Sequence, residues 1–284
     1  MIEIINHGIY TSIQDMGRHD FQAFGVPISG ALDQQSFCMA NRILNNPLKA
    51  AVLEFSFKGP KIRFHKATHI TLTGANMKAK LNEAEINYYI PVKVYEGDVL
   101  DLGTAKNGCR TYLGVAGGIK TKKILKSRSQ FKDLTSEFRI SKKVLLPVGK
   151  STFDPKKGAH LYSPNQDYSQ KVLGVYPGPE FNQLSKIEQN QIFITTFTLS
   201  KLNNRMAFSF EEKITNKLPQ IWTAPVIPGT VQCSPDGSLI VLMRDAQVTG
   251  GYPRILQLNY ESINLLAQKT TRDQVRFKLL PRIE

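Results

Sequence analysis

The sequence predicts a mainly β protein with a few helices, arranged as two β-rich units. Apolar residues make up 41% of the 284 residues, which is enough for a sizeable buried core. Most of the chain consists of short segments with strand-like alternation, separated by turn residues, as is typical of barrels and sandwiches. Segments in which apolar residues follow helical spacing are few.

The predicted strands recur along the whole chain. Residues 69–89 alternate around two turn-like sequences, GAN and NEAE. Within residues 90–103, Glu96-Gly97-Asp98 is expected to form a turn between two strands. Further strands are expected within residues 109–119, 143–149, 171–179 and 238–260.

The clearest predicted helix covers residues 33–44. Phe37, Ala40 and Leu44 follow helical spacing, and Pro47 cannot continue the helix. Two more helices are expected, at residues 179–193 and 261–268.

A polar stretch at residues 163–170 marks the predicted boundary. We expect one unit at residues 1–165 and another at residues 166–284. These boundaries are approximate and allow the chain to cross between the units. Each unit is expected to contain at least one helix.

The residue types exclude several classes of protein. No apolar run approaches the roughly 18 residues of a membrane span, and the start of the chain has no signal-peptide pattern. Cys38, Cys109 and Cys233 lack the spacing of a disulfide framework or a zinc site. His65 and His69 lie in a strand-like segment, where four residues span about 13 Å. We therefore expect a cytoplasmic protein that contacts no membrane and has no metal site on this chain.

The formal net charge of +14 suggests an anionic partner. Residues 120–143 hold nine Lys or Arg against two acidic residues. Phe131 and Phe138 do not interleave with these cations as a nucleic-acid stacking platform would. A solvated basic face, or a dock for an acidic protein, therefore fits better than nucleic-acid binding.

Two apparent cofactor motifs fail on inspection. Residues 114–121 (GVAGGIKT) resemble a phosphate-binding loop, but Ile119 replaces the glycine before the lysine. Residues 76–80 (NMKAK) lack the methionine that follows a biotinylated lysine. No covalently attached biotin is therefore expected on this chain.

Polar residues directly follow a predicted buried strand in residues 228–253. The candidate site residues there are Asp245, Gln247, Thr249, Gly250 and Gly251. The adjacent glycines allow backbone N–H groups to face an anion or a carbonyl oxygen. Alternatively, this loop only turns the chain and Asp245 caps it.

The stretch IQDMGRHDFQAFGVPISGALD, residues 13–33, has a similar character. It contributes six candidates: Gln14, Asp15, Arg18, Ser29, Gly30 and Asp33. Ser29 and Gly30 precede a predicted helix, and a helix N-terminus favours anions. The alternative is ordinary capping by Ser29 or Asp33. Arg18 is expected to bind a phosphate or carboxylate, with its replacement by lysine leaving stability nearly unchanged.

Several motifs in fixed order resemble one family. They are IQDMGR, GVPISGALD, ANRILNN, AVLEFSFKGPKIRF, RTYLGVAGGI, SRSQ, NRMAF and GTVQCSPDGSLIVLMRDAQVTGGYP. They resemble biotin-dependent carboxyltransferase-like proteins, a family that includes allophanate hydrolase subunit 2, KipA and the C component of 5-oxoprolinase. The resemblance covers about residues 2–268.

The resemblance implies two cyclophilin-like β-barrel units and a multi-protein assembly. The expected partners are the other two components of 5-oxoprolinase, a KipI-like B component and a LamB/YcsF-type A component. The expected activity is opening of 5-oxoproline to glutamate, with ATP and Mg²⁺ used by the assembly. Two alternatives remain: a non-catalytic KipA-like antagonist, and a carboxyltransferase component for a urea-like substrate.

A role for the candidate residues follows from that chemistry. Phosphorylation of the lactam oxygen needs cations and amide dipoles, for which Arg18, Arg128 and Arg205 are candidates. Asp245 could orient a nucleophile or hold the Mg²⁺ that the assembly uses, although no resident metal site is predicted on this chain. Asp15, Arg18, Asp245 and Gln247 are the predicted catalytic residues, and the other candidates are predicted to bind substrate or nucleotide. Loops of both units are expected to meet at one cleft, which a partner could complete.

The chain also departs from the family pattern. Asn204 replaces an acid, Ala207 replaces a glycine, and Asp20 stands where a glycine is usual. The Gly-Gly, Gly-Arg segment expected after SRS is replaced by DLTSEFRIS. These departures favour the non-catalytic alternative.

Overall fold

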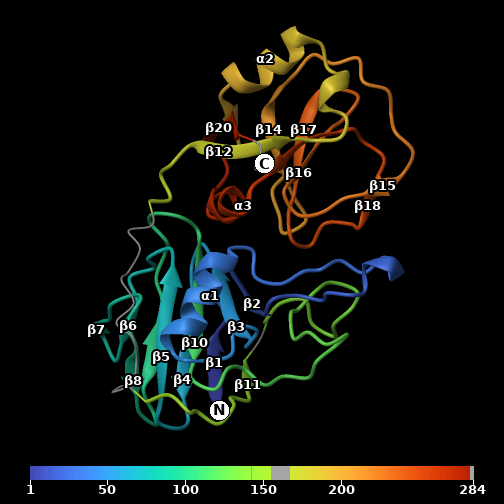
Figure 1. Cartoon of the computed structure of the whole chain (residues 1–284). Helices are drawn as coiled ribbons and strands as arrows, with labels where there is room; N and C mark the ends of the chain where they lie inside the picture. Colours follow the sequence, from blue (N-terminus) through green and yellow to red (C-terminus); the bar gives the residue numbers. More distant parts are fainter. Residues whose placement is uncertain (142, 155–166, 282–284) are drawn as a thin grey trace. The chain divides into compact units, whose positions relative to one another are not determined.

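The computed structural model describes residues 1–141, 143–154 and 167–281 (Figure 1). Its contacts divide the chain into two compact units. Unit 1 comprises Met1–Arg18 and Ser29–Asp167, and unit 2 comprises His19–Ile28 and Tyr168–Glu284. The segment that follows Arg18 therefore groups with unit 2 before the chain returns to unit 1. The predicted boundary after residue 165 lies outside the described residues.

Unit 1 contains two antiparallel sheets around one apolar core. The strand orders are β11-β1-β4-β9-β6-β7 and β2-β3-β10-β5-β8. Core residues come from both sheets, for example Ile4 and Leu100 from the first and Leu53 and Leu113 from the second. The strands are β1 Ile2–Asn6, β2 Tyr10–Gln14, β3 Val52–Ser56, β4 Lys61–Phe64, β5 Thr68–Gly74, β6 Lys80–Leu81, β7 Ala84–Glu85, β8 Val92–Val94, β9 Val99–Asp101, β10 Arg110–Val115 and β11 Val144–Leu146.

Unit 2 is built on a seven-stranded sheet of order β13-β20-β12-β19-β16-β17-β14. A bridge between Leu199 and Phe210 links the two ends of this order, so the sheet nearly closes into a barrel. Strands β15 and β18 form a separate two-stranded sheet. The strands are β12 Val172–Pro177, β13 Phe197–Thr198, β14 Ala207–Lys213, β15 Ala224–Pro225, β16 Thr230–Cys233, β17 Ser238–Leu242, β18 Thr249–Gly250, β19 Arg254–Leu258 and β20 Gln274–Leu279.

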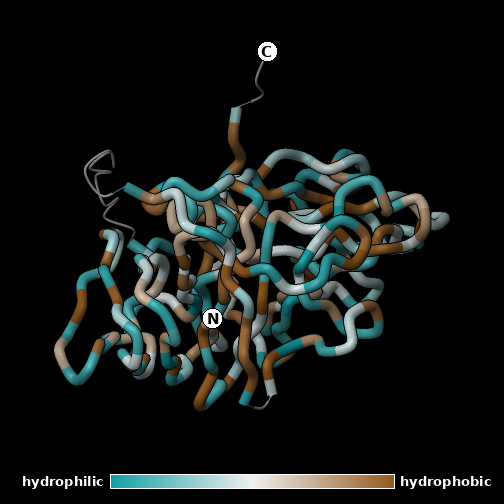
Figure 2. The backbone as a smooth tube through the Cα atoms, turned by 90° about the horizontal axis from the view of Figure 1, so that it is seen from below, coloured by the Kyte–Doolittle hydropathy of each residue, from teal (hydrophilic) through white to brown (hydrophobic). Residues whose placement is uncertain are grey.

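Local sequence explains most of these elements. Hydrophobic and hydrophilic stretches follow one another closely along the backbone (Figure 2). In β1, Ile2 and Ile4 are buried and Glu3 is only partly buried. Gly97 adopts a positive φ of 89°, and the Tyr95 N–H donates to the Asp98 carboxylate at 2.7 Å. The predicted turn there is confirmed. It joins β8 and β9, which belong to different sheets.

Three α-helices occur among the described residues. Helix α1, Gln34–Ile43, packs against β5 and β10 (Figure 1), and α3 spans Tyr260–Ala267. Both agree with prediction. The helix predicted at residues 179–193 is instead a 3₁₀ turn, Phe181–Gln183, followed by α2, Lys186–Ile194. A second 3₁₀ turn covers Gln22–Phe24.

The start of α2 has a clear physical cause. Ser185 accepts a hydrogen bond from the Glu188 N–H, and the Glu188 carboxylate accepts one from the Ser185 N–H. This capping box fixes the first helical residue at Lys186, seven residues after Pro179. None of the helices in the described part of the chain has the length and apolar character that a membrane span requires.

Candidate functional site

Asp15 is the centre of a polar network at the end of β2. Its Oδ1 accepts hydrogen bonds from the Ser127 hydroxyl at 2.6 Å and the Ser129 hydroxyl at 2.7 Å. The Gly17 N–H also donates to Oδ1 at 2.9 Å, and the Arg128 N–H donates to Oδ2 at 2.7 Å. Four donors of the chain itself therefore hold this buried carboxylate, which fastens residues 127–129 to β2.

Arg18 belongs to the same network. Its side chain is fully buried, and its Nη2 donates a hydrogen bond to the Ser129 carbonyl oxygen. This burial argues against the expectation that Arg18→Lys leaves stability nearly unchanged, and we now expect that variant to be less stable. A buried guanidinium that bonds to backbone cannot be replaced by an ammonium without loss of packing and geometry.

Gln14 and Arg128 complete this group of candidates. Gln14 is fully buried, and its amide donates to the Ser12 hydroxyl at 3.0 Å and to the Gln130 carbonyl at 3.3 Å. Gln130 in turn accepts from the Ile13 N–H at 3.0 Å. Sequence reasoning missed Ser127, Ser129 and Gln130 as site residues, although all three lie within the SRSQ motif.

Ser29, Gly30 and Asp33 lie where the chain enters α1. Asp33 is the N-cap: its two carboxylate oxygens accept from the Ser36 N–H at 3.0 Å and the Ser36 hydroxyl at 2.6 Å. Gly30 has a φ of 94°, and a Cβ on it would lie 2.9 Å from both the Asp15 oxygen and the Gly17 nitrogen. Capping by Asp33, the alternative interpretation, is confirmed. Anion binding at this helix start stays a prediction.

A buried carboxylate that sequence reasoning missed supports the same helix start. Glu54 on β3 accepts hydrogen bonds from the Tyr112 hydroxyl and the Leu32 N–H, both at 2.9 Å. The Tyr112 oxygen also accepts from the Asp33 N–H at 2.8 Å. Burial, followed by the charges of Glu54 and Asp33, raises the pKa of Tyr112 well above its usual value. Glu54 thus positions the chain that leads into α1.

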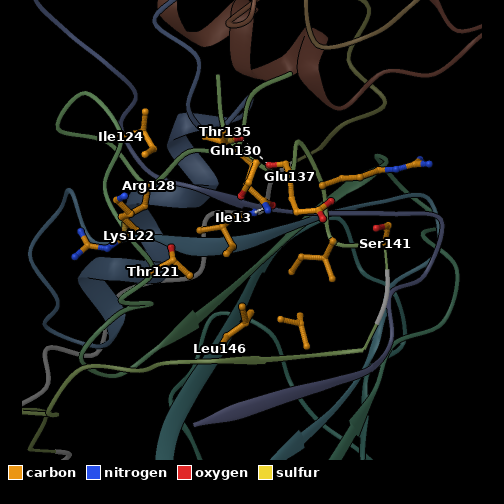
Figure 3. A pocket seen from close by; sticks show the side chains of 14 residues that line it. Ile13, Thr121, Lys122, Ile124, Arg128, Gln130, Thr135, Glu137, Ser141 and Leu146 are labelled. Atoms are coloured by element: carbon orange, nitrogen blue, oxygen red, sulfur yellow. Dashed lines mark hydrogen bonds between the residues drawn. The ribbon is translucent and has the colours of Figure 1, made fainter. Parts of the chain in front are cut away.

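Unit 1 contains a pocket of about 420 Å³, which we call the β2–β11 pocket. Figure 3 shows Lys122 and Arg128 on one side and Glu137 on the other. Of the predicted site residues, Arg128 alone is among the described residues that line it. The lining residues are Ile13, Thr121, Lys122, Ile124, Arg128, Gln130, Thr135, Ser136, Glu137, Arg139, Ile140, Ser141, Val144 and Leu146. Most of them come from the basic segment noted in the sequence.

Unit 2 contains a pocket of about 340 Å³, which we call the Gly-Gly pocket. It brings together three predicted residues, Gln247, Gly250 and Gly251, but not Thr249, which is exposed on β18. The lining residues are Leu202, Asn204, Met206, Ala207, Gln232, Ile240, Leu242, Gln247, Gly250, Gly251 and Tyr252. A Cβ on Gly250 would lie 2.5 Å from the buried Gln232 amide nitrogen, so glycine allows the close approach.

Two departures from the family pattern also line the Gly-Gly pocket. The Asn204 side-chain oxygen accepts from the Met206 N–H at 2.7 Å and from the Ala207 N–H at 3.2 Å. Asn204 therefore shapes the turn that leads into β14. Its amide replaces the charge that an acid would bring to the pocket wall.

Arg205 and Asp245 form a two-point ion pair. Arg205 Nε lies 2.8 Å from Asp245 Oδ2, and Nη2 lies 3.1 Å from Oδ1. The side chains are 10% and 8% exposed, so the pair is largely shielded from water. The Asp245 carboxylate is therefore committed to Arg205, which is not the arrangement expected for a Mg²⁺ ligand. No group of three or more potential metal-ligating side chains occurs within the described residues.

The sequence and the fold of this chain match those of known proteins. Residues 24–279 match the model for the carboxyltransferase domain, subdomains A and B, and the chain belongs to this family. It is 32% identical to the C component of 5-oxoprolinase from Escherichia coli over 98% of this chain and 90% of that protein. The corresponding identity to the C component of 5-oxoprolinase from Haemophilus influenzae is 27%, over 98% of this chain and 91% of that protein.

Solved structures show the same fold. The crystal structure of Kluyveromyces lactis urea amidolyase matches 99% of this chain at 26% identity and a TM-score of 0.90. That of the K. lactis urea carboxylase matches 99% at 26% identity and a TM-score of 0.89. This chain spans only 19% and 27% of those two proteins. The predicted fold class, mainly β with a few helices, is confirmed, and the seven-stranded sheet of unit 2 is nearly closed like a barrel.

Proposed function

We propose that this chain is the C component of an ATP-dependent 5-oxoprolinase, which opens 5-oxoproline to glutamate together with a KipI-like B component and a LamB/YcsF-type A component. The observation that carries the proposal is the end-to-end match to the E. coli protein of that name, at 32% identity over 98% of this chain and 90% of the relative. The name of that relative supports a role as one component of an enzyme assembly.

The Gly-Gly pocket is the part of this chain that suits the chemistry. A lactam amide is a poor electrophile, and transfer of a phosphoryl group to its oxygen activates the adjacent carbon toward water. Water adds to that carbon, the ring C–N bond breaks with protonation of the nitrogen, and an acyl phosphate results. A second water then attacks its carbonyl carbon, the carbonyl oxygen gains negative charge, and phosphate leaves to give glutamate. The backbone N–H of Gly251 and the carboxamide of Gln247 are donors suited to that charge.

The charged residues beside the pocket have a positioning role. The Arg205–Asp245 pair joins the loop before β14 to the loop after β17, because the Asp245 N–H also donates to the Arg205 carbonyl oxygen at 2.9 Å. Asn204 directly precedes Arg205 in the sequence, and Gln247 follows Asp245 by two residues. The ion pair thereby holds both of these residues in the lining of the pocket. Since Asp245 is engaged by Arg205, the described residues do not fit a Mg²⁺ site of this chain's own, and we assign no step to the ion.

Carboxyl transfer to a urea-like substrate is the second candidate. It is favoured by the TM-scores of 0.90 and 0.89 to urea amidolyase and urea carboxylase. In that case the Gly-Gly pocket would hold a urea carbonyl, and another protein would supply the biotin. A binding protein of the KipA type, which forms a complex without turnover, is the remaining alternative.

Co-expression with the B and A components tests the proposal. We expect ADP release that depends on 5-oxoproline and disappears when this chain is omitted. Transfer of carboxyl groups from carboxybiotin to urea, without 5-oxoproline-dependent ADP release, would support the second candidate instead. A folded three-protein complex that releases no ADP and transfers no carboxyl group would contradict both enzymatic proposals.

A further inference from the structure

The β2–β11 pocket lies between two strands that end their sheets. β11 is one of the two outer strands of the six-stranded sheet, and β2 is one of the two outer strands of the five-stranded sheet. The Gln130 N–H donates to the Ile13 oxygen at 2.9 Å, and the Ile140 N–H donates to the Thr11 oxygen at 2.8 Å. Residues 131–139 are thus fastened to β2 at both ends and form a wall over the gap between the sheets.

The interior of this pocket is apolar. Ile13, Ile140 and Leu146 are at most 5% exposed and belong to the core of unit 1. Ile124 and Val144 extend the same surface. The volume of about 420 Å³ falls in the range of pockets that take small organic molecules, and barrel mouths are frequent places for them.

The rim of the pocket is cationic. Lys122, Arg128 and Arg139 line it, against a single acid, Glu137. Within the described residues, none of these three cations forms an ion pair. The Arg128 Nε is buried and has no hydrogen-bond partner there. A buried N–H without an acceptor is costly, so an oxygen from a ligand is the natural partner.

We propose that the β2–β11 pocket binds a small amphipathic monoanion, such as an aliphatic carboxylate. Its apolar body would lie against Ile13, Ile140 and Leu146, and its carboxylate would lie on the side of Lys122 and Arg128. Glu137, on the opposite side (Figure 3), disfavours a second negative group. All lining residues belong to unit 1, so binding requires neither ATP nor a partner and is independent of the proposed function.

Titration of the full chain with octanoate tests this site. Displacement of the fluorescent sulfonate 8-anilinonaphthalene-1-sulfonate reports occupancy, and calorimetry gives the stoichiometry. We expect one octanoate per chain, weaker binding of butyrate, and at least about tenfold weaker binding of octylammonium, because the rim repels a cation. Equal binding of octanoate and octylammonium, or no binding of octanoate, would overturn the proposal.

Matched variants locate the bound anion. Lys122→Glu should weaken octanoate binding at least about tenfold, whereas Lys123→Glu, an exposed neighbour outside the lining, should change it less than about twofold. Ile124→Trp should fill the pocket and abolish binding, whereas Leu145→Trp, on an exposed position of β11, should not. If both members of each pair behave alike, the anion binds elsewhere and the assignment fails.

The titrations would give a different result if a segment of a partner protein, and not a small molecule, occupied the β2–β11 pocket. In that case octanoate would not bind the chain alone, and the assembled complex would shield Lys122 from amine-specific labelling. That outcome would also overturn the small-molecule assignment. Thermal melting of each variant shows whether it is folded, and the Ile124 and Lys122 variants provide independent tests should one of them be unstable.

Discussion

At the residue scale, the contacts of Asp15 connect the end of β2 to residues 127–129 of unit 1. One carboxylate serves four donors, three of them from residues 127–129, which lie more than 110 positions away in the sequence. A charged acceptor suits this position because several N–H and O–H groups converge on it in a buried place. Asp15 therefore acts first as a structural link, and any catalytic role would have to use the same oxygens.

Asp15→Asn should destabilise unit 1 by about 2–4 kcal/mol, because an amide offers one acceptor oxygen and leaves buried donors unpaired. Urea unfolding followed by circular dichroism measures this change. Asp133→Asn is the matched control, since Asp133 is exposed and has a positive φ that asparagine tolerates. Equal stability of the two variants would show that the network around Asp15 contributes little.

At the element scale, a tight joint connects β2 to α1. The Ala31 N–H donates to the Asp15 carbonyl at 3.0 Å, and Gly30 lies directly against the Asp15–Gly17 backbone. Glu54 and Asp33 then position the first turn of the helix. This connection explains why residues 15–17 and 30–33 match neither strand nor helix periodicity, because backbone approach and buried hydrogen bonds define their conformation.

Gly30→Ala tests the joint. A left-handed backbone alone costs about 1 kcal/mol, and the clash with the Asp15 and Gly17 backbone should add roughly 1–3 kcal/mol. Gly97→Ala is the control, because Gly97 also has a positive φ, of 89°, but no atom lies within 4 Å of its added Cβ. A larger loss of unfolding free energy for Gly30→Ala than for Gly97→Ala is expected in chemical denaturation.

The ion pair between Glu180 and Arg254 in unit 2 is expected to make stability depend on pH. The Glu180 carboxylate accepts from Arg254 Nη2 at 2.9 Å and from the Arg254 N–H at 2.7 Å, linking the residue before the 3₁₀ turn Phe181–Gln183 to β19. Burial tends to raise the pKa of Glu180, but the hydrogen bonds and charge of Arg254 outweigh it and hold the pKa below its usual value of 4.5.

The free energy of unfolding that the ionised Glu180 carboxylate contributes should therefore be lost at acidic pH. A group whose pKa is lower in the folded state stabilises the fold above the unfolded pKa, and loses that contribution as pH falls through the folded pKa. We expect Glu180→Gln to unfold at lower urea concentration than the parent at pH 7, with the difference shrinking below pH 4.5. A difference that is constant from pH 7 to pH 3 would contradict a role for the carboxylate charge.

At the scale of the whole molecule, the sequence predicts elements whose causes are local, but it does not predict contacts between distant segments. Periodicity and capping predict α1, α3 and the Glu96–Asp98 turn because their causes lie within a few residues. The start of α2 was misplaced at residue 179, although the Ser185–Glu188 capping box is a local signal that could have located it. The partners of Asp15 and the gap between β2 and β11 depend on strand pairing across the chain, which periodicity does not encode.

The same distinction applies to the Gly-Gly pocket. Gln247, Gly250 and Gly251 were identifiable because they follow a buried strand in one continuous segment. Asn204, Ala207 and Gln232 join them through the pairing of β14, β17 and β16, and only the fold brings them there. Sequence reasoning therefore found three lining residues, treated Asn204 and Ala207 only as departures from the family pattern, and missed Gln232.

The Gly-Gly pocket provides the sharpest test of function in the assembled complex. Gln247→Ala removes a donor from the pocket without removing buried apolar contacts, so the complex should still form. If the carboxamide stabilises a developing oxyanion, 5-oxoproline-dependent ADP release should fall at least about tenfold, mainly in kcat. Gln220→Ala, an exposed glutamine outside the pocket, should leave the rate unchanged. Equal rates for both variants, in complexes of equal yield, would place the lactam chemistry outside this pocket and shift the search to the partner proteins.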